Sequence, residues 1–298
     1  MDHQEEQMTG MRFLFVTVLN LLITAAEIVG GLLSGSLALL SDAFHNLGDS
    51  LSIVLGYVAQ RISGKPQNRQ RTFGYRRAEI LAAFVNGLFL IGVSIVLMVE
   101  AARRFAKPEP INGDIMLIVA VIGLAANLLS AVLMHHGSKD SLNIKATYLH
   151  VLADALSSVA VIIGGILIVL FDITWVDPLL TLLVSFYIIY ETWPVIHETV
   201  QILMQTAPKL DYDQIAADIV EIPGVLRVHH IHAWLIDENK IVFSAHVNMK
   251  DVKLSEVEKT VAQISSMLTE RYHICHVTIQ PEVHHGETDA LFVDKDKV

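Results

Sequence analysis

The sequence predicts an α-helical membrane protein with six transmembrane helices, followed by a small C-terminal α+β domain. Three observations support this fold class. Apolar residues make up 53% of the 298 residues and charged residues only 17%, and the mean hydropathy is +0.50. Several stretches reach the ~20 mostly apolar residues that a bilayer-spanning helix needs. After Pro208 the chain becomes polar, and short helix and strand patterns replace the long apolar stretches.

The apolar stretches number six, and we expect each to cross the membrane. The first is preceded by an acidic N-terminus and is long enough to span, which favours a transmembrane helix over a cleaved signal peptide. Residues 1–207 are therefore expected to form a six-span membrane domain. The six segments run over 11–33, 37–62, 78–102, 112–134, 144–171 and 177–204.

The short loops predict the orientation of these spans. Eight basic residues follow the second and fourth segments, against three in the loops on the other side. Because basic loops stay in the cytoplasm, both termini are expected there, in a multi-pass protein of the cell (inner or plasma) membrane. The eight are Arg61, Lys65, Arg69, Arg71, Arg76, Arg77, Lys139 and Lys145, and the three are Arg103, Arg104 and Lys107.

The C-terminal domain is predicted over residues 208–285, in the order α-β-β-α-β. Ser255 is expected to cap its second helix, with Glu258 completing a capping box. Residues 286–298 are expected to form a flexible tail. The predicted elements are the helix Asp211–Glu221, the strands Val225–Ile236 and Ile241–Met249, the helix Ser255–Arg271 and the strand His276–Gln280.

Charge and cysteine content exclude other classes of protein. The single cysteine rules out an intrachain disulfide. A net charge of −10 leaves no basic footprint for nucleic acid. Residues 208–298 carry 15 acidic and 9 basic side chains and 8 of the 14 histidines.

In the first predicted strand, alternation places His229 on one face and both His230 and His232 on the other.

Ionisable residues inside two apolar segments point to a metal site. The second segment contains His45 and Asp49, and the fifth contains His150 and Asp154. Such residues cost ~3 kcal/mol or more near the bilayer centre, so they are functional candidates. Each pair is spaced i,i+4, which puts both side chains on one helix face. Two facing pairs supply two imidazoles and two carboxylates, a tetrahedral set suited to Zn²⁺.

The two segments also match each other in sequence. Residues 45–52 and 150–157 share the pattern H-x-L-x-D-x-L-S. They occupy the second span of each group of three, and an odd number of spans gives the two groups opposite topology. This arrangement is typical of transporters with inverted repeats and a site at mid-membrane. The alternative for each pair is a hydrogen bond that packs two helices.

Further acidic residues within the apolar segments include Asp42, Glu27 and Glu191. Asp42 is expected to have a helix-end role, with an entry path to the metal site as the alternative. Glu27 is expected to hydrogen-bond between helices, with a cavity as the alternative. Glu191 is expected at the membrane interface.

At these residues the chain resembles the cation diffusion facilitator family, and in particular its bacterial zinc/cadmium/cobalt efflux branch. The resemblance rests on S-D-A-F-H-x-x-x-D over 41–49, F-G-Y-R-R-A-E over 73–79, H-x-x-x-D over 150–154 and V-H-H-I-H-A-W over 228–234. It implies a homodimeric metal/proton antiporter whose cytoplasmic domain has a ferredoxin-like, metallochaperone-like fold. It also implies that the two intramembrane pairs form the transport site, and His45 resembles the zinc-preferring variant.

The resemblance also implies metal sites in the C-terminal domain. His229, His246 and Glu282 match a cytoplasmic zinc site at the dimer interface, and His232 and Cys275 match a second one. Imidazole, carboxylate and thiolate are all good Zn²⁺ ligands. The alternative is a polar strand face with ordinary surface histidines.

Together these features predict efflux of a divalent cation, foremost Zn²⁺, by proton antiport. Zn²⁺ is the expected substrate and also the ion that regulates or stabilises the dimer. No organic cofactor is expected. The expected partners are a second copy of the chain, the lipid bilayer, divalent cations and protons, but no nucleic acid. Two alternatives are an intramembrane zinc hydrolase, which needs an open ligand position, and a zinc sensor that binds without transporting. The chain is not expected to be an enzyme.

Overall fold

The computed structural model describes residues 2–135, 142–286 and 289–292, with side chains described over 16–133, 148–286 and 289–292. The chain divides into two compact units. The first comprises residues 1–58 and 82–196, and the second comprises residues 59–81 and 197–298.

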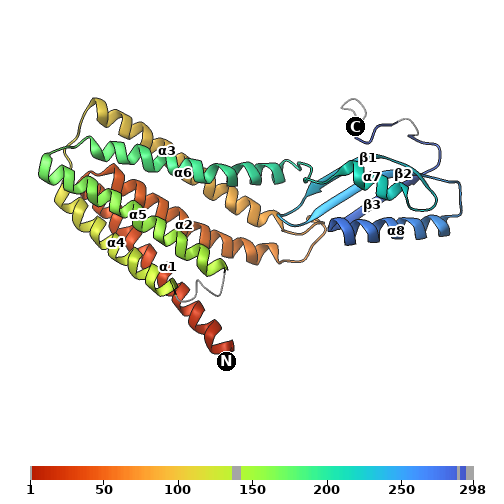
Figure 1. Cartoon of the computed structure of the whole chain (residues 1–298), viewed down its shortest axis with the longest axis horizontal. Helices are drawn as coiled ribbons and strands as arrows, with labels where there is room; N and C mark the ends of the chain where they lie inside the picture. The colour runs from red at the N-terminus through yellow and green to blue at the C-terminus, as the bar shows by residue number, and fades with distance from the viewer. Residues whose placement is uncertain (1, 136–141, 287–288, 293–298) are drawn as a thin grey trace. The chain divides into compact units, whose positions relative to one another are not determined.

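Six long helices form most of the first unit (Figure 1). Five of them are long and apolar enough, within the described residues, to cross a membrane. The exception is α2, in which Asp42, His45, Asn46 and Asp49 lower the mean hydropathy. Its 27 residues still span ~40 Å, more than the ~30 Å hydrocarbon core. The helices are α1 Asp2–Ser34, α2 Leu37–Ser63, α3 Arg77–Ala106, α4 Gly113–His135, α5 Leu142–Phe171 and α6 Val176–Leu203.

Apolar clusters hold the helices of this unit together. Helix α4 packs against both α1 and α5. Helix α3 lies beside α6, where a Cβ atom on Gly87 would stand 2.7 Å from Ile196. A buried cluster joins α2 to α4 and α5, and a second joins α2 to α3, so α2 is packed on several sides. The first comprises Ala38, Leu39, Met116, Ala120, Val161 and Ile168, and the second Leu37, Leu97 and Ala101.

The C-terminal domain has the predicted α-β-β-α-β order. Its sheet has the strand order β1-β2-β3, with β1 antiparallel to β2 and β2 parallel to β3. Both helices pack on the sheet through one buried apolar cluster that includes Ile219, Phe243 and Leu268. The elements are α7 Tyr212–Val220, β1 Val225–Leu235, β2 Ile241–Met249, α8 Leu254–Tyr272 and β3 Ile274–Glu282. The last strand is two residues longer at each end than predicted.

The two helices of this domain begin differently. Helix α7 starts as predicted, because the carboxylate of Asp211 accepts a hydrogen bond of 3.0 Å from the amide of Gln214. The capping box predicted for α8 is wrong. Lys253 occupies the N-cap with extended backbone and makes no side-chain cap. Ser255 already lies inside the helix, where its hydroxyl no longer occupies the capping position.

The alternation predicted for the first strand is interrupted, although the rings of His230 and His232 lie together as predicted, with centroids 4.9 Å apart. The register of β1 against β2 shifts between His229 and His232, and His230 has a left-handed backbone with φ of 53°. The imidazole rings of His229 and His230 consequently both lie against that of His246, with centroids 5.4 and 4.4 Å away. A β-bulge inserts a residue that redirects neighbouring side chains, and such bulges recur beside functional sites.

Candidate metal centres

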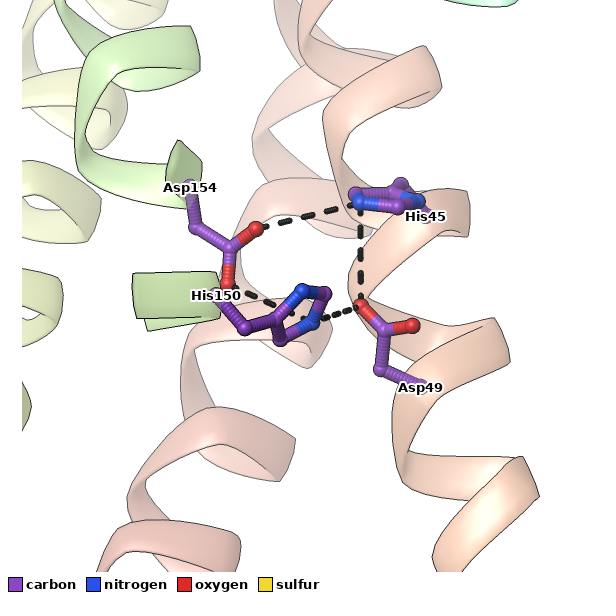
Figure 2. A group of neighbouring side chains, drawn as sticks. All are labelled: His45, Asp49, His150 and Asp154. Carbon is purple, nitrogen blue, oxygen red and sulfur yellow. Dashed lines mark hydrogen bonds and ion pairs between the residues drawn. The ribbon is translucent and has the colours of Figure 1, made fainter. Parts of the chain in front are cut away.

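Helices α2 and α5 bring their histidine–aspartate pairs together (Figure 2). Nε2 of His150 lies 3.0 Å from Oδ2 of Asp49 and 3.9 Å from Oδ2 of Asp154. Nε2 of His45 lies 3.7 Å from Oδ2 of Asp49 and 3.8 Å from Oδ1 of Asp154. Each imidazole therefore faces one carboxylate from its own helix and one from the other. We call these four residues the tetrad.

The tetrad fits a tetrahedral zinc ion by distance and by donor type. Ligands placed 2.0–2.1 Å from a tetrahedral metal are roughly 3.3 Å apart. One potential ligand atom from each residue can be chosen so that all four lie within 4.8 Å of one another. Two nitrogen and two oxygen donors form the mixed set that Zn²⁺ accepts. Small side-chain movements would bring these atoms to coordination distance.

The position of α2 is fixed at the level of the tetrad. Gly48, between His45 and Asp49, lies so close to α3 that a Cβ atom there would stand 2.3 Å from Leu90. The Nδ1 atom of His45 is buried and has no hydrogen-bond partner among the described residues. The Nε2 atom faces both carboxylates, so the ring presents this nitrogen to the site.

Asp177, at the start of α6, anchors the N-terminus of α2. Its carboxylate accepts hydrogen bonds from the amide of Leu37 at 2.9 Å, from the amide of Ala38 at 3.2 Å and from the hydroxyl of Ser36. The first amides of a helix have no partner within the helix, so this carboxylate satisfies groups that would otherwise be buried and unpaired. Sequence reasoning missed Asp177, because its partners are about 140 residues away.

Two more acidic residues of the apolar segments are almost fully buried. Asp42 accepts a hydrogen bond of 2.7 Å from the hydroxyl of Ser157 on α5. Glu27 on α1 accepts one of 2.9 Å from the side-chain amide of Asn46 on α2. The interhelical hydrogen bond predicted for Glu27 is thus present. Asp42 also bonds between helices, so its role extends beyond the helix end.

Two cavities flank the tetrad, of about 410 and 220 Å³. His45, His150 and Glu191 line both of them. Asp154 and Tyr187 line the larger cavity, and the smaller one also contains Asp49. The prediction that Glu191 lies at the membrane interface is wrong, since its carboxylate stands beside the tetrad. The sixteenth residue of a 28-residue helix is near the middle of that helix.

A second group of potential ligands lies on the sheet of the C-terminal domain. Nε2 of His229 lies 3.2 Å from Oε2 of Glu282, and Nδ1 of His246 lies 3.0 Å from Oε1 of the same residue. The three come from β1, β2 and β3, respectively, and their potential ligand atoms lie within 4.8 Å of one another. Two imidazoles and a carboxylate supply three zinc ligands and leave one position for a further ligand.

The chain after β3 covers this second group. The backbone carbonyl of His285 accepts a hydrogen bond of 2.7 Å from the side-chain amide of Asn248. Gly286 has φ of 66°, and a Cβ atom there would stand 2.2 Å from Nε2 of His229. Further on, the carbonyl of Leu291 accepts a hydrogen bond of 2.8 Å from the amide of Ile231. His229 is consequently only 1% exposed.

His232 and Cys275 are not brought together. His232 pairs with Ser244, which pairs with Thr278, three residues along β3 from Cys275. Neither residue belongs to a group of three or more potential ligands among the described residues. Burial and the charge of Asp237 raise the pKa of the Cys275 thiol. Because the thiolate is the metal-binding form, this shift makes Cys275 a weaker ligand.

Family models match both parts of the chain. The cation efflux transmembrane domain matches residues 13–204, which include the tetrad. The cytoplasmic domain of cation efflux proteins matches residues 207–284, which include the second ligand group.

Curated proteins from several bacteria are similar along most of the chain. The zinc transporter ZitB of Escherichia coli is 38% identical over 284 residues, covering 94% of this chain and 90% of that protein. The cadmium, cobalt and zinc/H⁺–K⁺ antiporter of Bacillus subtilis is 38% identical over 89% of this chain and 86% of its own length. The metal cation efflux system protein CzcD of Cupriavidus metallidurans is 37% identical over 87% and 82%. The chain therefore belongs to the cation efflux family, the cation diffusion facilitators that its motifs resemble.

Proposed function

We propose that this protein exports Zn²⁺ from the cytoplasm in exchange for protons, with the metal bound by His45, Asp49, His150 and Asp154. The observation that carries the proposal is the convergence of these four ligands, from α2 and α5, at distances suited to a tetrahedral ion. The names of the similar proteins support zinc as the substrate and extend the range to cadmium and cobalt. The same donor set accepts several such ions.

The ligand chemistry explains why metal and proton fluxes are coupled. Imidazole and carboxylate bind a metal only when they are deprotonated, so Zn²⁺ and protons compete for the tetrad. In an alternating-access cycle, Zn²⁺ enters the tetrad from the cytoplasm and leaves on the other side. Protons arriving from that side help to displace it and reset the site. The cavities beside the tetrad supply room for the hydrated ion on its way to the ligands.

The second ligand group supports a role for zinc in the dimer. We propose that His229, His246 and Glu282 bind Zn²⁺ in a cytoplasmic domain through which two copies of the chain associate. Zinc there stabilises the dimer and shifts the population of transport conformations. The membrane domain spans residues 1–207 and the cytoplasmic domain 208–285. Both termini lie in the cytoplasm of a plasma-membrane protein, as the excess of basic residues in its loops favours.

The alternatives fit the site less well. A zinc hydrolase needs an open ligand position for water, and the tetrad offers four protein ligands. The family to which the chain belongs transports cations and is not a family of enzymes. A sensor that binds zinc without moving it would have the same tetrad, and flux separates it from a transporter.

The test is zinc uptake into proteoliposomes under an imposed pH gradient. We expect gradient-driven uptake by the wild type and none by Asp154→Ala. The matched control is Asp114→Ala, which removes an exposed carboxylate from the first turn of α4 and should transport normally. Zinc binding without flux in the wild type would support the sensor. Equal flux in the wild type and Asp154→Ala would exclude the tetrad as the transport site.

A further inference from the structure

The carboxyl group of Glu27 is an ionisable group in the membrane domain outside the tetrad. Glu27 is 1% exposed and its partner Asn46 is 0% exposed. Nδ2 of Asn46 donates to Oε2 of Glu27 at 2.9 Å. The other oxygen, Oε1, is buried and has no hydrogen-bond partner among the described residues, and the same holds for Oδ1 of Asn46. Oε1 lies against α4, where a Cβ atom on Gly123 would stand 2.7 Å away.

Among the residues that the structure describes, the charged groups that act on Glu27 are acidic. Asp42 on α2 and Asp154 on α5 interact with it electrostatically. The described side chains of α1 include no other ionisable group, and Asp114 of α4 is nine residues from Gly123, ~13 Å along the helix. No lysine or arginine within the described residues pairs with Glu27. A buried charge without a counter-charge is costly, so this carboxyl group is most easily buried in its neutral, protonated form.

The amide of Asn46 can serve both states of this carboxyl group. In the orientation described, its NH₂ donates to the carboxylate form. Rotated by half a turn, its oxygen faces Glu27 and accepts a hydrogen bond from the protonated form. Asn46 is also the residue after His45, so the amide links the Glu27 carboxyl group to the helical turn that carries a tetrad ligand.

We infer that Glu27 is a proton-binding site of the exchange cycle, separate from the tetrad. The inference rests on the proposed function. Zn²⁺ replaces the protons of the tetrad by a divalent charge beside Asp154, which interacts with Glu27, so the charged form of the Glu27 carboxyl group costs less to bury. The carboxyl group then loses its proton to water. When zinc leaves, the acidic surroundings draw a proton back onto Glu27.

The test counts the protons released when zinc binds to the purified full-length protein. Calorimetry in buffers with different ionisation heats gives this number for the wild type, Glu27→Gln and Glu100→Gln. Glu100→Gln is the control, because Glu100 lies on α3 and is paired with Arg103 and Arg104. We expect Glu27→Gln to bind zinc and release about one proton fewer per ion. Glu100→Gln should match the wild type. Equal release from Glu27→Gln and the wild type overturns the inference.

A measurement on the unmodified chain covers the case in which Glu27→Gln does not fold. Infrared difference spectra record the carbonyl band of protonated carboxyl groups before and after zinc is added. We expect a zinc-sensitive band that shifts when the protein contains ¹³C-labelled glutamate and that persists in Glu191→Gln, which removes the glutamate lining both cavities beside the tetrad. A band that shifts only with labelled aspartate, or no band, overturns the inference. Absence of zinc flux in the wild type would contradict the proposed function and not this inference alone. The two failures can be told apart, because the spectrum without zinc still reports whether a glutamate is protonated.

Discussion

Nε2 of His150 on α5 lies 3.0 Å from Oδ2 of Asp49 on α2, although 101 residues separate them in the chain (Figure 2). Each helix supplies one histidine and one aspartate, so neither can complete a four-ligand site by itself. A movement of α2 relative to α5 therefore changes the ligand distances directly. This geometry gives a physical link between the conformation of the membrane domain and its affinity for metal.

Replacing Asp49 by asparagine should weaken zinc binding at the tetrad. The substitution keeps the shape of the side chain but removes a charged ligand that also contacts His150. Removing a residue that only supports a metal ligand already lowers metal affinity by ~10-fold or more. We therefore expect the loss of Asp49 to lower zinc affinity at least ~10-fold. Competition with a zinc-binding dye measures it, with Asp114→Asn as the control. Unchanged affinity in Asp49→Asn would contradict the assignment of this ligand.

Removing the anchor at the N-terminus of α2 should destabilise the membrane domain. Asp177→Ala leaves the amides of Leu37 and Ala38 buried without an acceptor. We expect a loss of ~1–3 kcal/mol in stability, seen as a lower melting temperature of the purified protein. Asp177→Asn retains an acceptor oxygen and should lose less, because asparagine satisfies helix amides about as well as aspartate. Equal melting temperatures for the wild type and the alanine variant would refute this role.

Adding a methyl group at Gly286 should loosen the segment that covers the second ligand group. The new Cβ atom would stand 2.2 Å from His229, and the left-handed backbone costs an L residue ~1–2 kcal/mol. We expect the Ile231 amide, which bonds to Leu291, to exchange its hydrogen roughly 5–30 times faster. Hydrogen exchange with mass spectrometry tests this. Gly92→Ala is the control, since no atom other than those of its chain neighbours and its own helix backbone lies within 4 Å of its Cβ position.

The contact between Tyr272 and Asp218 should make the stability of the cytoplasmic domain depend on pH at both extremes. Burial and the hydrogen bond to Asp218 raise the pKa of Tyr272 from 10.0 to about 12. The stabilisation is therefore complete below pH 10 and is lost as the pH rises through 12. Hydrogen bonds from Tyr272 and Gln214 lower the pKa of Asp218, so its contribution is lost as the pH falls below the ordinary value of 3.8.

Melting temperatures measured across pH test this coupling. Tyr272→Phe should flatten the decline between pH 10 and 12 and also reduce the decline at acid pH. The control is Tyr190→Phe on α6, where the side chain is 73% exposed. If the wild type and Tyr272→Phe show the same alkaline decline, the hydrogen bond to Asp218 does not contribute to it.

Patterns in the sequence predicted those structural features that depend only on residues close together along the chain. Apolar length predicted the long helices, and the polar pattern after Pro208 predicted the helix over 211–221 that the structure describes as α7. The capping box predicted at Ser255 was wrong, and the alternation predicted for the strand histidines was right only in placing His230 with His232. Helix α8 begins earlier, at Leu254, and a bulge in β1 turns His230 toward His246. No residue type in these segments forces a helix to begin at Leu254 or forces a bulge at His230, so the sequence pattern alone could not predict either feature.

The sequence by itself determined the class of the protein, its family motifs and the tetrad, because polar residues within apolar helices are costly and therefore conspicuous. Tertiary structure decided which distant groups meet. Only packing shows that Asp177 holds the start of α2, that Glu191 lies beside the tetrad and that Glu27 is buried against Asn46. These relationships depend on helix positions in space, and periodicity along one segment carries no information about which segment lies opposite.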